Sequence, residues 1–191
     1  MRFLLITAPT AEPVTTAEAK AHLRVEDTAS DTLIAALITA AREQAEHETG
    51  RALMVQTWDL LLDDFPSDSD SVIALAKPPV SAITHIKYTD AAGALQTFAA
   101  TDYSLDASGL LPRVLLGYDK SWPSVRAQQN AVQIRIVCGY ANAAAVPGAI
   151  KQWMLLNIGH WFENLESAAD GKREPMPFIN GLLDPYRMYQ L

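Results

Sequence analysis

The clearest pattern of hydrophobic and polar positions lies between Ser30 and Gly50. Apolar residues recur there at steps of three and four, which places them on one face of a helix. Ser30 and Asp31 have side-chain oxygens that cap helix starts, and Gly50 supplies the left-handed residue that commonly ends a helix. The apolar face begins with Leu and Ile and becomes Ala, so one half should be buried more deeply or pack more closely. The pattern predicts an amphipathic helix whose other face carries Arg42, Glu43, Glu46 and Glu48.

Helix patterns also occur on both sides of this stretch. Thr15 and Glu18 form a capping-box pattern, which predicts a short helix over about residues 16–24. Near the other end, Pro147 suits a first helical turn, and the apolar residues from Ala149 to Phe162 predict a helix buried on more than one side. A last short helix is expected over 178–183.

The middle of the chain has a different pattern, with short alternating or apolar runs separated by turn residues. Asp90–Gly93 is typical of a hairpin turn, and Ser67–Asp70 is expected to form a polar turn. So many short strands at close spacing favour an antiparallel sheet or small barrel over parallel βαβ units. The predicted strands cover residues 55–62, 72–75, 82–89, 94–98, 103–106, 113–116 and 132–137.

Together these elements predict an α+β protein that forms a single domain over residues 1–191. The helical ends, 15–53 and 146–187, are expected to pack as a small bundle. An antiparallel β lobe over about 54–140 is inserted between them. The opening residues are expected to be extended, without a strand assignment.

Composition restricts the class of protein. No apolar run is long enough to span a membrane, the opening MRFLLIT is too short for a signal-peptide core, and a cytosolic protein is expected. The single cysteine, Cys138, lies in an apolar run and is expected in the core. The net charge of −7 argues against general nucleic-acid binding, although it permits an acidic surface that DNA slides past.

No group of residues predicts catalysis, a cofactor or a metal. Glu18 with His22, and Glu43 with His47, offer only two ligands each, and a structural zinc site takes four. Such pairs are typical of solvated helix faces. His160 lies among aromatic residues, which favours a structural role, and the acids at 63–64 and 68–70 lack the spacing of a calcium loop. The tryptophans are expected as core or subunit-interface anchors. The sequence therefore predicts a protein that is not an enzyme.

Several segments, in order along residues 15–165, resemble the head–tail connector (adaptor) family of long-tailed bacteriophages, in its prophage branch. Their order and spacing carry the resemblance, since no single motif is diagnostic. The matching segments are Thr16–Val25, Asp31–Leu37, Ala41–Glu43 with Glu46, Thr49–Arg51, Gln56–Trp58 with Phe65–Pro66, Pro78–Val80 with Ile86 and Tyr88, Gly139–Tyr140 with Val146–Pro147, and Gly159–Asn164. Residues 166–174 and the C-terminal tail depart from the family pattern.

The resemblance implies a structural virion protein. Connectors of this family form a ring, typically of twelve copies, on the portal protein, and their fold is a small helical bundle with a β insertion. The ring extends the DNA channel toward a stopper or tail-completion protein, without sequence-specific DNA binding. The implied location is the neck of the virion, and the host cytoplasm during assembly. The alternative is another phage neck or tail-completion protein.

A ring of identical chains needs two different contact surfaces on each copy. The first candidate surface is the polar side of the long helix, at Arg42, Glu43 and Glu46. The second is the C-terminal tail, which is unusually aromatic and apolar for a chain end and is expected to dock on the chain's own core or on a neighbour. Its candidate contact residues are Tyr186, Arg187, Tyr189 and Leu191.

Overall fold

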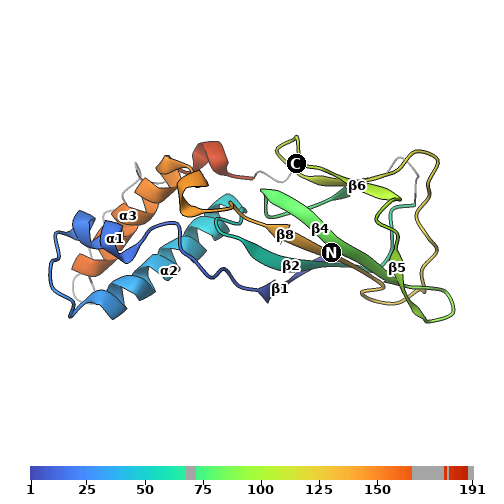
Figure 1. The fold of residues 1–191 in the computed structure, drawn as a ribbon, viewed down its shortest axis with the longest axis horizontal. Coiled ribbons are helices and arrows are strands. Elements are labelled where there is room, and N and C mark those ends of the chain that lie inside the picture. Colours follow the sequence, from blue (N-terminus) through green and yellow to red (C-terminus); the bar gives the residue numbers. More distant parts are fainter. Residues whose placement is uncertain (68–71, 165–178, 180, 189–191) are drawn as a thin grey trace, which may run out of the picture. The chain divides into compact units, whose positions relative to one another are not determined.

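The computed structural model describes residues 1–67, 72–164, 179 and 181–188. The chain divides into two compact units (Figure 1). The β unit consists of Met1–Pro9 and Val55–Gly139, and the helical unit consists of Thr10–Met54 and Tyr140–Leu191. No helix in the described part of the chain is both long and apolar enough to cross a membrane.

The β unit contains two antiparallel sheets, as the alternating pattern predicts. The five-stranded sheet has the strand order β1 (Arg2–Thr7), β2 (Gln56–Leu62), β8 (Val132–Cys138), β4 (Val80–Thr89) and β5 (Leu95–Phe98). The three-stranded sheet has the order β3 (Ile73–Ala74), β7 (Arg113–Leu116) and β6 (Tyr103–Asp106).

One face of the five-stranded sheet forms the core of the β unit. The register places Leu60, Ile134 and Ile86 side by side on three adjacent strands, and all three are fully buried. Phe98 of β5 continues this row and stacks on Tyr103 of β6, with 5.8 Å between ring centroids. The period-2 alternation of the strands thus selects which side chains enter the core.

An aromatic cluster closes this core. Phe65 stacks on Trp122 with ring centroids 4.9 Å apart and an interplanar angle of 8°. Phe65 also meets the edge of Tyr88 at 5.9 Å. Trp122 therefore acts as a core anchor, one of the two roles expected for the tryptophans.

The helical unit is built from α1 (Thr16–Leu23), α2 (Asp31–Thr49) and α3 (Gly148–Glu163), with short 3₁₀ helices η1 (Ala143–Ala145) and η2 (Asp184–Tyr186). Its core joins the apolar face of α2 to α3. Leucine and isoleucine fill the first half of the α2 face, whereas Ala41 and Ala45 are fully buried in the second half. The prediction that the two helical ends pack together is confirmed.

The caps of the first two helices differ. At α1 the capping box is present, since the Glu18 carboxylate accepts from the Thr15 N–H at 2.7 Å, and the Glu18 N–H donates to the Thr15 hydroxyl at 3.1 Å. At α2, Ser30 occupies the N-cap position but its side chain makes no capping hydrogen bond. Gly50 ends α2 in the left-handed conformation with φ of 69°.

The two ends of the chain differ from the sequence-based expectation, and some predicted segments lie outside the described residues. The opening residues form β1, an edge strand paired with β2, because its apolar residues extend the sheet. Within the last expected helix, 178–183, Ile179 is helical, and η2 follows at Asp184–Tyr186. The segment 166–174, Phe178 and the turn residues 68–70 lie outside the described residues.

Candidate assembly surfaces

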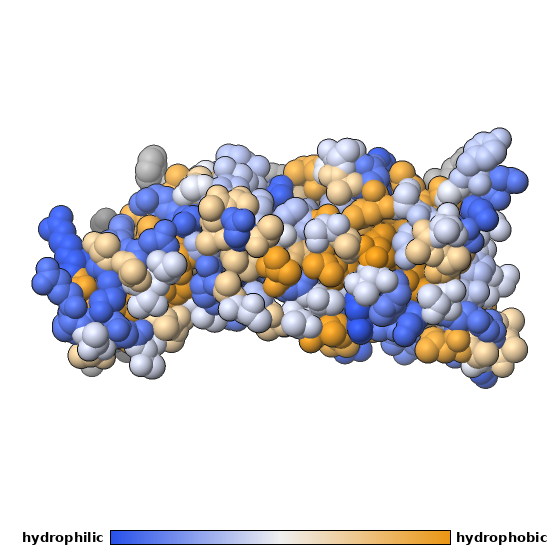
Figure 2. Space-filling view, viewed as in Figure 1, coloured by the Kyte–Doolittle hydropathy of each residue, from blue (hydrophilic) through white to orange (hydrophobic). Residues whose placement is uncertain are grey.

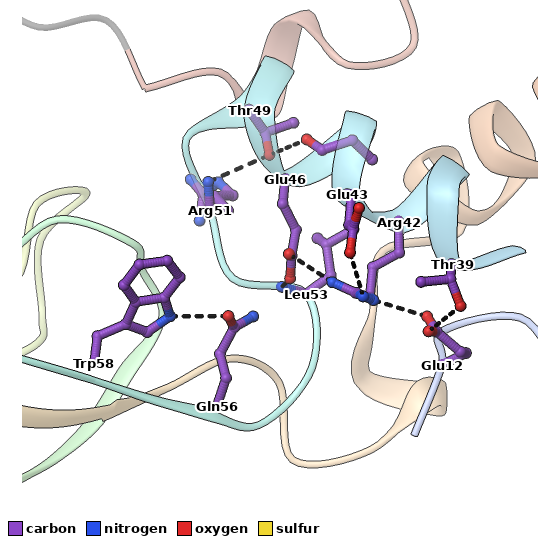
Figure 3. Close-up of polar contacts among 11 residues, drawn as sticks. Glu12, Thr39, Arg42, Glu43, Glu46, Thr49, Arg51, Leu53, Gln56 and Trp58 are labelled. Carbon is purple, nitrogen blue, oxygen red and sulfur yellow. Dashed lines mark hydrogen bonds and ion pairs between the residues drawn. The ribbon is translucent and has the colours of Figure 1, made fainter. Parts of the chain in front are cut away.

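Arg42 is the centre of an ion-pair cluster in the helical unit (Figure 3). Its side chain is 7% exposed, and its Nε donates to Glu12 Oε2 at 2.8 Å while its Nη1 donates to Glu46 Oε2 at 2.9 Å. Glu12 also accepts from the Thr39 hydroxyl at 2.9 Å. The cluster thus fastens the segment before α1 to the middle of α2.

The sequence pattern predicts Arg42 and Glu46 on the exposed face of α2. This prediction is wrong, because their side chains are only 7% and 13% exposed. Both side chains are enclosed because Glu12, which is distant in sequence, supplies a counter-charge for Arg42. Glu46 also accepts the Leu53 N–H at 2.8 Å. Glu43 remains open, with its side chain 67% exposed and a 3.4 Å ion pair to Arg42. A subunit contact at these three residues stays a prediction, and Glu43 is the accessible member.

The C-terminal segment docks on the end of α2 in its own helical unit. The Met188 N–H donates to the Thr49 carbonyl at 2.9 Å, and Arg51 Nε donates to the Tyr186 carbonyl at 2.7 Å. Arg187 pairs with Glu48 at 3.2 Å. Tyr186 therefore packs against the chain's own core, which is one of the two expected dockings, and Arg187 contacts α2 through Glu48. Tyr189 and Leu191 lie outside the described residues.

Gly50 permits this docking. Its positive φ of 69° strains any residue with a Cβ, and a Cβ placed there would lie 3.2 Å from the Cβ of Met188. The same glycine therefore ends α2 and leaves space for the returning chain.

The second face of the five-stranded sheet carries a polar row that the sequence analysis missed. Asp59 of β2 is 2% exposed and accepts two hydrogen bonds from Arg135 of β8, both at 2.8 Å. Gln133 donates a third at 2.6 Å. The hydrogen bonds from Arg135 hold the pKa of Asp59 below its usual value, despite its burial. Aspartate and arginine in separate strands give no local spacing signal, so only the register reveals this pair.

His85 of β4 lies beside Arg135 in the same cross-strand row. Burial, and then the charges of Lys87 and Arg135, lower the pKa of His85. His85 is therefore neutral at neutral pH, since the ordinary pKa of histidine is about 6.5.

Exposed apolar side chains lie on both edge strands of this sheet. Leu4, Leu5 and Ile6 of β1 are 46%, 42% and 39% exposed, and Leu95 of β5 is 67% exposed. Figure 2 shows hydrophobic side chains reaching the surface over the strands. Among the described residues no strand pairs with the outer edge of β1 or β5.

The residues considered for chemistry have structural contacts. Glu18 belongs to the α1 cap and also pairs with Lys151 at 3.1 Å, and hydrogen bonds from Thr15 lower its pKa to about 2. His160 contacts Asn164, one turn further along the chain. Cys138 is buried, as predicted, with its Sγ 3.7 Å from the Gln56 carbonyl oxygen. Within the described ranges no group of three or more His, Cys, Asp or Glu side chains is placed to hold a metal ion.

Comparisons with known proteins connect this fold to phage-like particles. Residues 14–93 match the sequence model of the family described as "Phage gp6-like head-tail connector protein". None of the curated proteins matches the chain.

Three solved structures contain similar chains, each covering 100% of this chain and 97% of the other. A chain of "Neck of empty GTA particle computed with C6 symmetry" has a TM-score of 0.82 and 24% identity. A chain of "Virion of native gene transfer agent (GTA) particle" has a TM-score of 0.81 and 23% identity. A chain of "Neck of native GTA particle computed with C12 symmetry" has a TM-score of 0.71 and 25% identity.

The α+β fold is confirmed over the full length of the chain by these structures. The family match begins just before α1 and ends at Gly93, in the turn between β4 and β5. The resemblance to head–tail connectors that the sequence indicates is therefore confirmed.

Proposed function

We propose that this protein is a structural head–tail connector that assembles as a ring in the neck of a phage-like particle. The observation that carries the proposal is the match of residues 14–93 to the connector family, supported by the full-length similarity to a chain of a neck with C12 symmetry. Twelve copies are the expected number.

The properties of the two units suit such a role. A closed ring of more than two copies uses a head-to-tail interface, so each copy presents two different surfaces. The helical unit presents the exposed side of α2 with Glu43. In the part of the β unit that the structure describes, no strand pairs with the outer edge of β1 or β5. These two surfaces differ from each other, as a head-to-tail contact requires.

The proposed partners are the portal protein on one side of the ring and a stopper or tail-completion protein on the other. DNA passes through the central channel. The net charge of −7 supports passage without tight binding, because phosphate contacts dominate affinity for DNA and require basic residues.

Electron microscopy of the protein alone and mixed with its portal protein tests the proposal. We expect rings with twelve-fold symmetry on one end of the portal. An unrelated acidic protein of similar size, mixed with the same portal, serves as the control. A monomer in the absence of portal is compatible with the proposal, since the portal can template the ring. The absence both of rings and of portal binding under all conditions would refute it.

A further inference from the structure

All charged strand residues of the five-stranded sheet lie on one face. The register aligns Arg2, Leu61, Gln133 and Lys87 in one cross-strand row, and it aligns Leu4, Asp59, Arg135 and His85 in the next. Residues two apart on a strand point to the same side of a sheet, so both rows share a face. That face is opposite the one containing Leu60, Ile134 and Ile86.

This face is electropositive within an acidic protein. It carries the three cations Arg2, Lys87 and Arg135 and the single anion Asp59, a balance of +2 against −7 for the whole chain. Asp59 is 2% exposed beneath Arg135 and Gln133, so its charge is covered. His85 adds no charge at neutral pH, because its pKa is lowered.

Exposed apolar side chains lie at both edges of this charged face. The register places Leu4 on this face, and Leu95 joins it because it pairs with Thr89, two residues from Lys87. Arginine is enriched at protein–protein contacts, and exposed apolar side chains add area that a partner can bury.

The exposed side of α2 has complementary properties. Glu43 is 67% exposed. The exposed positions before it on the helix are Thr32, Ala35, Ala36 and Ala40, and those after it are Gln44 and His47. Small side chains allow a helix axis to approach a sheet closely, and the carboxylate of Glu43 provides the opposite charge.

We infer that the electropositive sheet face of one copy receives the exposed side of α2 from the next copy, with Glu43 facing Lys87. The two surfaces come from different units and cannot substitute for each other, so the contact is head-to-tail and propagates around a ring. Opposite charges fix the register of such a contact and disfavour the wrong neighbour. This inference rests on the proposed connector function, because it needs a ring of identical copies.

Charge reversal tests the contact. Glu43→Lys alone and Lys87→Glu alone should each reduce the fraction of chain assembled on the portal about tenfold, since each creates a like-charge juxtaposition at every interface. The matched control is Glu26→Lys, which reverses an exposed acid of the same unit outside α2. It should leave assembly unchanged. Circular dichroism of each variant verifies that the chain is folded.

A mixture of the two single variants gives the decisive result. In a ring that alternates them, every interface has either the original Glu43–Lys87 pair or the reversed pair. The equimolar mixture should therefore assemble like the unaltered chain, whereas either variant alone does not. Rescue in the mixture arises only from contacts between copies, because no single chain contains the reversed pair.

Three outcomes would overturn the inference. Rings of normal yield from both single variants would show that assembly uses other surfaces, and the connector function would stand. A defect in both variants without rescue in the mixture would also exclude this pairing. If Lys87→Glu leaves the ring intact but changes retention of packaged DNA, the sheet face is directed at DNA. Failure of the unaltered chain to form rings or bind portal would instead refute the proposed function.

Discussion

The two units of this protein place their charged groups differently. In the helical unit, Arg42 pairs with three acids and its side chain is almost completely buried. The C-terminal segment of this unit covers the end of α2. In the β unit the corresponding pair, Asp59 and Arg135, lies on the sheet face opposite the core, with the acid buried and the base 30% exposed. The comparison indicates that the ion pairs of the helical unit join its segments to one another, whereas the ion pair of the β unit forms part of a sheet surface. Four substitutions or conditions test this contrast, in order of decreasing effect.

Arg135→Ala should have the largest effect on stability. It removes the two hydrogen bonds that Asp59 accepts from Arg135 and leaves Gln133 as the remaining side-chain donor. The loss of charge-assisted hydrogen bonds of this kind costs about 3 kcal/mol. Urea unfolding of the variant should show this loss at pH 7. The loss should shrink in acid, because protonation removes the buried charge of Asp59. A loss that is independent of pH would mean that packing, rather than charge, is the cause.

Arg42→Ala should cost less, about 2 kcal/mol, because its partners keep other donors. Glu12 retains the Thr39 hydroxyl and Glu46 retains the Leu53 N–H. Ellipticity at 222 nm during urea unfolding reports the helical unit. Glu43→Ala is the matched control, and it should change stability by less than about 0.5 kcal/mol, since exposed pairs contribute little. Equal losses in the two variants would contradict the enclosed cluster.

Gly50→Ala should destabilise the helical unit by about 1.5 kcal/mol. Part of the loss comes from the left-handed backbone, and part from the 3.2 Å approach to the Cβ of Met188. Thermal unfolding measures the change. Gly148→Ala is the control, because a Cβ at Gly148 meets nothing within 4 Å. If the two variants unfold alike, the docking of the C-terminal segment on α2 is not tight.

The smallest effect concerns pH. Glu18 has a folded pKa of about 2 against an ordinary 4.5, so its contribution is present above pH 4.5 and is lost as the pH falls toward 2. The side chain is 46% exposed, so solvent screening limits this contribution to less than about 1 kcal/mol. Glu18→Gln should flatten the acid limb of the stability curve between pH 4.5 and 2. Glu26→Gln should leave that limb unchanged.

Sequence patterns located most of the fold because most elements carry their own local signal. The capping box at Thr15, the glycine at the end of α2 and the alternation of β4 are examples. The opening strand β1 gave no such signal, since six mostly apolar residues become a strand only when β2 is available for pairing.

The candidate surfaces were harder to anticipate, because both depend on partners distant in sequence. Periodicity places Arg42 on a polar face, but Glu12, 30 residues earlier, encloses it. Asp59 and Arg135 are 76 residues apart, and their pairing follows from strand register alone. By contrast, the exposure of Glu43 agrees with its spacing on the helix. The docking of the C-terminal segment agrees with the aromatic and apolar composition of that segment.

The division into units has a consequence for how the chain can be made. The polypeptide passes between the units three times, after Pro9, Met54 and Gly139. β8, which lies between β2 and β4 in the sheet, and α3, which completes the helical core, both come late in the sequence. A nascent chain therefore cannot finish either core until most of its length has left the ribosome, and a cut at any one crossing leaves two covalent links between the units. Under the proposed ring assembly, a partly synthesised chain would therefore present neither unit in its completed form.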